Sequence, residues 1–284
     1  MNWRNKGWRN RGWRNTAAHA VAACALACAA ADAWAGRSCE DVAAPADQAA
    51  VAFDTALNLA KTLDASGQKV AIIARRGQHL EKYGLTFSHA GFVVKTGDGW
   101  VVYHDLNICG SATAKLFSQG LAEFFGDSLV SQEAAVVVPE PWLQDRLAQL
   151  LASKEETFRM HHAAYSAVAY PFATKYQNSN GWLLETYARA ASDQLLPTRD
   201  EAQAWLKVAG YKPSIVTIDP LTRLGGRMFK ANVFFDDHPP ELRWSDKITV
   251  NTGDAVMRFV AKRAVAQPGC NHGAFPDTVC LVSP

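Results

Sequence analysis

Two histidines lie at the outer ends of two short β-type runs that form a predicted hairpin. The runs Phe87–Val94 and Trp100–His104 flank the turn-rich segment Lys95–Gly99, which predicts a hairpin with a loop of about five residues. His89 then begins one strand and His104 ends the other, and these two ends of a hairpin lie side by side. Imidazole is the side chain best suited to move protons near neutral pH. The spacing therefore predicts a shared site for acid–base chemistry.

A polar turn that runs into an amphipathic helix offers a nucleophile for these histidines. The segment Tyr176–Glu185 places Ser179 at or just before a predicted helix N-terminus. That end of a helix presents free N–H groups and partial positive charge, which favour a developing anion. The competing interpretation is helix capping, because Asn and Ser are preferred N-cap residues. The segment by itself favours capping.

The first 35 residues have the pattern of a secretory signal peptide. Five cationic residues between Arg4 and Arg14 precede an alanine-rich apolar run from about Thr16 to Ala31, and Ala33-Trp34-Ala35 matches a small-x-small cleavage site before Gly36. The apolar run is shorter than a usual membrane span. A competing lipoprotein-type site ends at Cys24. We expect cleavage near Ala35/Gly36 and a periplasmic or secreted protein.

Removing this leader changes the charge balance of the chain. The full chain has 29 basic and 27 acidic residues; without the five basic and one acidic residue of the leader, 24 and 26 remain, a net charge of −2. No basic patch with interleaved aromatic residues follows, so the sequence gives no support for nucleic-acid binding. No later run is long and apolar enough to predict a transmembrane segment.

Four cysteines remain after the leader, and they allow three pairings. Cys270 and Cys280 bracket a loop that contains Pro and Gly, which favours a Cys270–Cys280 disulfide and leaves Cys39–Cys109 as the second. An oxidising compartment makes disulfides more common than free thiols. Cys39 also allows a rival arrangement, in which a cysteine before a helix precedes His89 as in unpermuted NlpC-type peptidases.

The rest of the chain mixes helical and β-type segments without strict alternation. Helical spacing is found at 49–63, 116–125, 142–153, 182–191, 199–209 and 254–264, and β-type runs at 70–75, 134–138, 215–218, 232–235 and 248–250. Such a mixture is typical of an α+β fold rather than a doubly wound sheet. We expect one domain over 36–284, with a core at 68–192 and a C-terminal β-rich elaboration at 193–284.

The order of these motifs resembles the circularly permuted papain-like proteins of the NlpC-type superfamily. In that superfamily a histidine strand comes first, a second polar residue lies on the next strand, and an Asn-Cys pair opens a later helix. The resemblance implies a permuted papain-like core, an antiparallel sheet packed on helices, with His89 as base, His104 as orienting residue and Ser179 as nucleophile. The chain departs from the pattern at Ser179, and a serine hydroxyl depends on a well-aligned base more than a thiol does.

Nearly all of the chain after the leader is similar to the uncharacterised bacterial exported family called domain of unknown function 2145. This resemblance implies a family but no activity. The segments that carry it are Arg75–Gln78, Tyr83–Gly91, His104–Gly110, Tyr170–Phe172, Tyr176–Asn180, Ala202–Leu206 and Phe235–Pro239.

These observations predict an exported hydrolase or acyltransferase that acts on a cell-envelope peptide or acyl substrate. The predicted catalytic residues are Ser179, His89 and His104, and the predicted substrate-binding residues are Asn178, Asn180 and Trp182. The alternative is a non-catalytic envelope-binding protein that keeps the cleft. A third class is a purely structural envelope protein.

Neither a cofactor nor a metal is expected. Asp236-Asp237-His238 and His104-Asp105 each lack a spaced set of three or four ligands. The former is more typical of a loop with Asx-type turns. His79 and the pair His161-His162 have no patterned neighbours, and we expect them at the surface.

Overall fold

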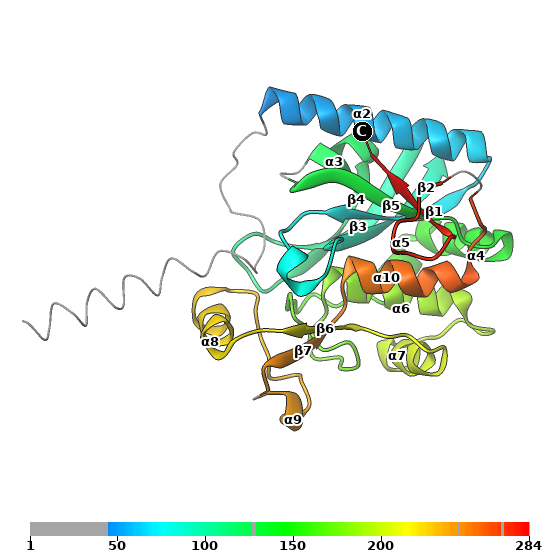
Figure 1. Cartoon of the computed structure of the whole chain (residues 1–284). Coiled ribbons are helices and arrows are strands. Elements are labelled where there is room, and N and C mark those ends of the chain that lie inside the picture. The colour runs from blue at the N-terminus through cyan, green and yellow to red at the C-terminus, as the bar shows by residue number, and fades with distance from the viewer. Residues whose placement is uncertain (1–44, 127–128, 244, 268–269, 284) are drawn as a thin grey trace, which may run out of the picture. The chain divides into compact units, whose positions relative to one another are not determined.

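The computed structural model describes residues 45–283 except 127–128, 244 and 268–269. Its centre is a six-stranded antiparallel sheet in the order β4-β3-β2-β1-β5-β8 (Figure 1). The strands are β1 Val70–Arg76, β2 His89–Thr96, β3 Gly99–Asn107, β4 Ala114–Gly120, β5 Ser131–Val137 and β8 Val279–Val282.

The central strands are apolar on both faces because helices cover both sides of the sheet. On one side, residues of α2 (Ala46–Ser66) and α3 (Leu121–Gly126) form a core cluster with Ile73 and Val93. On the other side, residues of α4 (Pro141–Ala152), α6 (Ser179–Ala191) and α10 (Gly253–Val260) form a second cluster with Ile72 and Phe92. Figure 1 shows α2 and α6 on opposite sides of the strands.

The β2–β3 hairpin turns more tightly than the sequence predicts. Thr96 pairs with Gly99, so only Gly97 and Asp98 lie between the two paired positions. Gly99 has φ of +117°, a backbone conformation that favours glycine. The short turn brings the start of β2 beside the end of β3, where the two histidines lie.

Two predictions about secondary structure are wrong in part. The segment 116–125, predicted as a helix, is divided between strand β4 and helix α3. In α2, the apolar residues of the predicted helix do not all lie on one buried face. Val51, Phe53 and Leu57 of α2 are exposed, while Leu59 and Leu63 are buried with the small residues of the same face.

The C-terminal region has more helix than strand, so the prediction of a β-rich elaboration is wrong. Within the described part of 193–284 the helices are α7 (Arg199–Val208), α8 (Pro220–Phe229), α9 (Pro240–Arg243) and α10, against three four-residue strands. Strands β6 (Ser214–Thr217) and β7 (Lys247–Val250) form a separate two-stranded sheet, and β8 joins the main sheet. The apolar run at 232–235, predicted as a strand, is irregular, and Asn232 and Phe234 bond to residues 166–167 instead of joining a sheet.

The remaining elements are the helix α5 (Lys154–Phe158) and the short 3-10 helices η2 (Glu81–Tyr83) and η3 (Ala261–Arg263). No helix among the described residues is long and apolar enough to cross a bilayer. The fold is α+β, with an antiparallel sheet packed between helices, as the sequence predicts at this level.

Candidate functional site

Ser179 is the first residue of α6, and the local sequence explains why the helix begins there. The side chain of Asn178 accepts a hydrogen bond from the backbone N–H of Gly181 at 2.8 Å, which caps the first turn. Ser179 is only 6% exposed. Its hydroxyl lies close enough to the phenol of Tyr165 to lower the pKa of that phenol. The helix therefore presents a buried hydroxyl at its positive end.

The segment that carries Tyr165 is held between α6 and the edge of the sheet. Its backbone pairs with the residues just before β4, with Tyr165 N–H donating to the carbonyl of Ala112 at 2.8 Å. Gln177 fixes the preceding residues, because its amide donates to the carbonyl of Met160 and its oxygen accepts from the N–H of His162, both at 2.8 Å. These contacts place His161 and Tyr165 at defined positions near the start of α6.

His161 faces a buried carboxylate of β3. Its Nδ1 lies 3.4 Å from Oδ1 of Asp105, whose side chain is fully buried, while the imidazole keeps 11% exposure. Burial raises the pKa of Asp105, and the adjacent His161 opposes that rise. Burial also raises the pKa of Tyr165 to about 12, an effect that Ser179 opposes and Asp105 strengthens. We call Asp105, His161, Tyr165 and Ser179 the helix-side cluster.

The two histidines of the hairpin form a second group. Nε2 of His89 lies 2.8 Å from Nδ1 of His104, and Nε2 of His104 lies 2.7 Å from Oε1 of Gln119. An amide oxygen can only accept, so His104 donates from Nε2 to Gln119. The Nδ1 of a neutral His104 then accepts a hydrogen bond from Nε2 of His89. We call His89 and His104 the histidine pair.

The surroundings of the histidine pair are apolar and cationic. Both rings pack against Phe124 of α3, with centroids 5.9 and 5.3 Å away. The guanidinium of Arg75 lies 4.5 Å from the centroid of the same ring and donates to the Phe124 carbonyl. Burial lowers the pKa of His89 well below its ordinary value, and the charges of Arg75 and His104 lower it further. His89 is therefore neutral at pH 7 and a weaker base than a free imidazole.

The structure brings the two predicted histidines together but does not bring Ser179 to them. Alternate residues of a strand point to opposite faces. Phe92 of β2 faces α6, with its ring 5.7 Å from that of Trp182, whereas His89 and His104 face Phe124 on the α2/α3 side. Within the described residues, no hydrogen bond joins Ser179 to either histidine.

The predicted substrate-binding residues all have internal partners. Asn178 caps α6, and the indole of Trp182 is fully buried and donates to the carbonyl of Thr157 at 3.2 Å. Asn180 accepts from the N–H of Ala90 at 3.1 Å and donates to the carbonyl of Ser88 at 3.0 Å. These side chains hold α6 on the sheet, because the helix start is buried and its polar groups need partners. None of the three presents a free side chain for a substrate.

One predicted disulfide is present, between Cys270 and Cys280. Cys109 is also disulfide-bonded. Cys39, its predicted partner, lies outside the described residues, as do the predicted leader and cleavage site. The Cys39–Cys109 pairing and the rival placement of Cys39 beside His89 therefore stay predictions.

The acidic motif at 236–238 is an internal network. Asp237 accepts from the backbone N–H of Tyr170 at 2.8 Å and lies 3.0 Å from Nδ1 of His238. No group of three or more ligating side chains gathers among the described residues. These contacts tie the 236–238 loop to the segment that precedes α6.

Sequence reasoning missed the polar partners on the helix side. His161 was predicted at the surface but is mostly buried against Asp105. Asp105 is adjacent to His104 in sequence, so the alternation of β3 turns it to the opposite face. Tyr165 lies in an irregular segment without periodicity, and no pattern in the sequence points to it.

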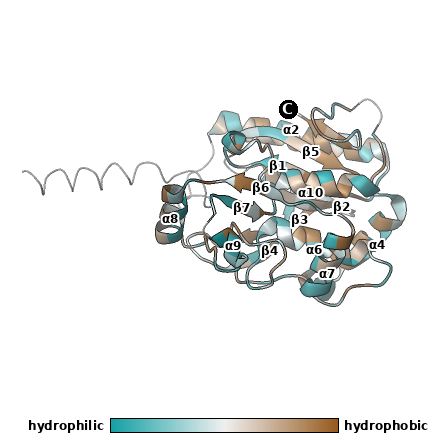
Figure 2. Ribbon diagram, turned by 60° about the horizontal axis from the view of Figure 1, so that its bottom comes forward, coloured by the Kyte–Doolittle hydropathy of each residue, from teal (hydrophilic) through white to brown (hydrophobic). Residues whose placement is uncertain are grey.

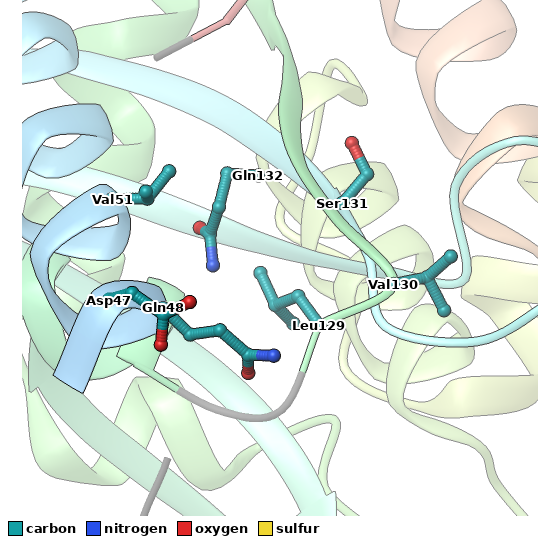
Figure 3. A pocket seen from close by; sticks show the side chains of 7 residues that line it. All are labelled: Asp47, Gln48, Val51, Leu129, Val130, Ser131 and Gln132. Atoms are coloured by element: carbon teal, nitrogen blue, oxygen red, sulfur yellow. The ribbon is translucent and has the colours of Figure 1, made fainter. Parts of the chain in front are cut away.

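A pocket is also found beside the start of α2. It is lined by Asp47, Gln48, Val51 and residues 129–132. Figure 3 shows Leu129 and Gln132 pointing toward Asp47, Gln48 and Val51 of α2, while Val130 and Ser131 point away. None of the predicted site residues lines this pocket.

The comparisons with known proteins identify one family. A family of uncharacterized proteins conserved in bacteria, DUF2145, matches residues 62–260, which include both polar groups. No curated protein and no solved structure matches the chain.

Proposed function

The chain belongs to the DUF2145 family of uncharacterized bacterial proteins, and we propose that it is an exported hydrolase or acyltransferase of the cell envelope. Ser179 is the proposed nucleophile, His161 its base and Asp105 the residue that orients the base. The observation that carries this proposal is the helix-side cluster. It comprises two neighbouring pairs on the α6 side of the sheet, His161 with the buried carboxylate of Asp105, and Tyr165 with Ser179 at the helix N-terminus.

Each member of this cluster supplies one requirement of acyl transfer. Oδ1 of Asp105 lies 3.4 Å from Nδ1 of His161 without a hydrogen bond between them. In the proposed mechanism a small rotation closes this contact, and the carboxylate then orients the ring and stabilises the imidazolium that forms when the base takes a proton. In the proposed step, the Ser179 oxygen bonds to the substrate carbonyl while its proton passes to His161. The proton then goes to the leaving group, and water releases the acyl group. The N-terminus of α6 favours the oxyanion.

A permuted papain-like core is part of the proposal. Its support is the position of α6, whose first turn is bonded through Asn180 to the start of β2. In this arrangement the β3 residue that faces the helix is Asp105, and His161 from a following segment takes the place that the sequence assigned to His89. A substrate in the envelope follows from the predicted leader.

The alternative is a non-catalytic envelope-binding protein, and one observation favours it. Ser179 lies beside Tyr165, whose pKa of about 12 keeps the phenol protonated and a poor base at pH 7. If Tyr165 stays the partner of Ser179 with substrate bound, the hydroxyl is not activated. The two functions therefore differ in whether His161 or Tyr165 controls Ser179.

The test is labelling of the purified protein with a fluorophosphonate, which reacts with activated serines. We expect labelling that is lost in Ser179→Ala and falls at least a hundredfold in His161→Ala. His89→Ala is the matched control, since it also removes an imidazole, and we expect a change of less than threefold. Absence of labelling in the unsubstituted protein favours the binding protein. Loss of labelling in His89→Ala but not in His161→Ala favours the site predicted from the sequence.

Export has a separate test. Protein recovered from the periplasm of cells that express the full chain should begin at or near Gly36. An intact leader on a cytoplasmic protein would contradict export and leave the serine chemistry to be judged by the labelling experiment.

A further inference from the structure

Helix α8 exposes an apolar stripe to solvent. Leu221, Leu224 and Met228 are 80, 52 and 63% exposed. Their spacing of three and four residues puts them on one side of the helix. Single exposed apolar residues are common on protein surfaces, but three aligned on one short helix are a patch that calls for a partner.

The stripe faces outward because the rest of α8 is anchored. Asp219 caps the helix by accepting from the N–H of Thr222 at 2.9 Å. Arg223 lies 4.6 Å from the ring centroid of Phe235 and donates to the carbonyls of Leu242, at 3.2 Å, and Arg243. Gly226 packs so closely that a Cβ there would lie 3.3 Å from Val233. The exposed stripe is therefore a fixed feature of the surface.

The charged residues toward the C-terminal end of the stripe are cationic, whereas the acidic Asp219 lies at the opposite end as the N-cap. The segment from Pro220 to Phe235 has three cationic residues and no acidic residue. Arg223 is used by the internal contacts, whereas Arg227 and Lys230 form no ion pair within the described part of the chain. Figure 2 shows hydrophobic and hydrophilic residues side by side on α8.

We propose that α8 docks the protein on an anionic phospholipid surface. The stripe of Leu221, Leu224 and Met228 enters the boundary between headgroups and acyl chains, while Arg227 and Lys230 contact lipid phosphates. An amphipathic helix with an apolar face and cationic flanks is the usual device for such binding. A complementary protein surface would need acidic groups around an apolar groove, whereas a bilayer supplies both features along its whole area. This inference does not depend on the proposed acyl chemistry.

The test is flotation of the purified protein, expressed as the full chain, with phosphatidylglycerol vesicles and with phosphatidylcholine vesicles. We expect binding to the anionic vesicles only, weakened by salt. Leu224→Glu should reduce the bound fraction at least tenfold. Val208→Glu is the matched control, because Val208 is 90% exposed on α7 and is not part of an exposed apolar stripe. We expect this variant to change binding less than twofold.

Several outcomes would overturn the proposal. They are equal binding by the unsubstituted and Leu224→Glu proteins, no binding to phosphatidylglycerol vesicles, or sedimentation showing that the stripe joins two copies of the chain. Circular dichroism checks that the variant folds. If Leu224→Glu unfolds the protein, Arg227→Glu provides the second variant, with an expected loss of at least threefold and a weaker salt dependence.

Discussion

The two faces of the sheet carry polar groups of opposite character at the same end of the β2–β3 hairpin. On the α2/α3 face, the histidine pair is enclosed by Phe124 and Arg75, and the pKa of His89 is depressed. On the α6 face, Asp105 lies 3.4 Å from His161, and its charge also acts on Tyr165, the neighbour of Ser179. By residue type the histidine pair looks more reactive, but its surroundings make His89 a weak base, whereas the helix-side cluster is the site for which we propose acyl transfer. Position on a face outweighs residue type.

The largest expected effect on stability is at the contact between α6 and β2, which holds the helix-side cluster against the sheet. Asn180→Ala removes hydrogen bonds to the N–H of Ala90 and to the carbonyls of Ser88 and Asn251. Because these backbone groups are buried, we expect the free energy of unfolding to fall by about 3 kcal/mol. Urea unfolding measures the loss.

The control for that substitution is Asn58→Ala on the exposed side of α2, for which we expect a change within about 0.5 kcal/mol. A loss below about 1 kcal/mol in Asn180→Ala would show that the amide does not hold the helix start on the sheet.

The histidine face depends on a close approach of β2 to β3 at Gly91. A Cβ at Gly91 would lie 2.9 Å from Cγ1 of Val102, 3.2 Å from the carbonyl oxygen of Tyr103 and 3.3 Å from Cβ of His104. We expect Gly91→Ala to lower the free energy of unfolding by about 2 kcal/mol through overpacking. Gly97→Ala, where a Cβ meets nothing within 4 Å, should be nearly neutral in the same urea measurement. Equal stability of the two variants would mean that the strands can separate without cost.

The depressed pKa of His89 predicts a pH dependence of stability. Unfolded chains bind a proton at this imidazole near its ordinary pKa, while the folded protein does so only at lower pH. Above pH 6.5 this imidazole is neutral in both states and does not change the stability. As the pH falls below 6.5, the free energy of unfolding decreases by at most about 1.4 kcal/mol per pH unit.

The readout is the difference between the unsubstituted protein and His89→Gln in urea unfolding at pH 7 and pH 5. Buried carboxyls with raised pKa values, such as Asp105 and Glu185, work in the opposite direction, and the difference removes their contribution because both proteins contain them. Parallel pH profiles for the two proteins would show that His89 does not titrate differently on folding.

The sequence predicts most elements because their patterns are local. The helices near 49–63, 142–153 and 182–191 and the hairpin all appear in the structure. The face of each histidine was not predictable in the same way. β2 is buried on both sides, with apolar residues at both alternations, so its pattern does not say which side faces α6. On the neighbouring strand β3, a shift of one residue decides whether His104 or Asp105 faces α6.

The helix-side cluster was unpredictable for a different reason. His161 and Tyr165 reach the site through backbone pairing between 163–165 and 112–114, and through the side chain of Gln177. Such long-range contacts leave no periodic signal in the sequence. The amphipathic pattern of α8 was likewise overlooked, because its two adjacent glycines interrupt the helical signal at residues 225–226.

The smallest expected effect is a change in thiol reactivity at residue 179, which tests directly which imidazole acts as the base for that residue. Ser179→Cys places a thiol at the start of α6, where the helix N-terminus and a nearby imidazole lower a thiol pKa from its ordinary value of about 8.5. We expect alkylation by iodoacetamide at pH 7 to be about tenfold faster than for a free cysteine. Adding His161→Gln should remove most of that gain, whereas adding His89→Gln should leave it, because His89 faces Phe124. The unsubstituted protein corrects for other thiols. A gain that depends on His89 alone would assign the base to the opposite face of the sheet. An ordinary slow thiol in every background would leave Ser179 without an activating base beside Tyr165, as the binding-protein alternative requires.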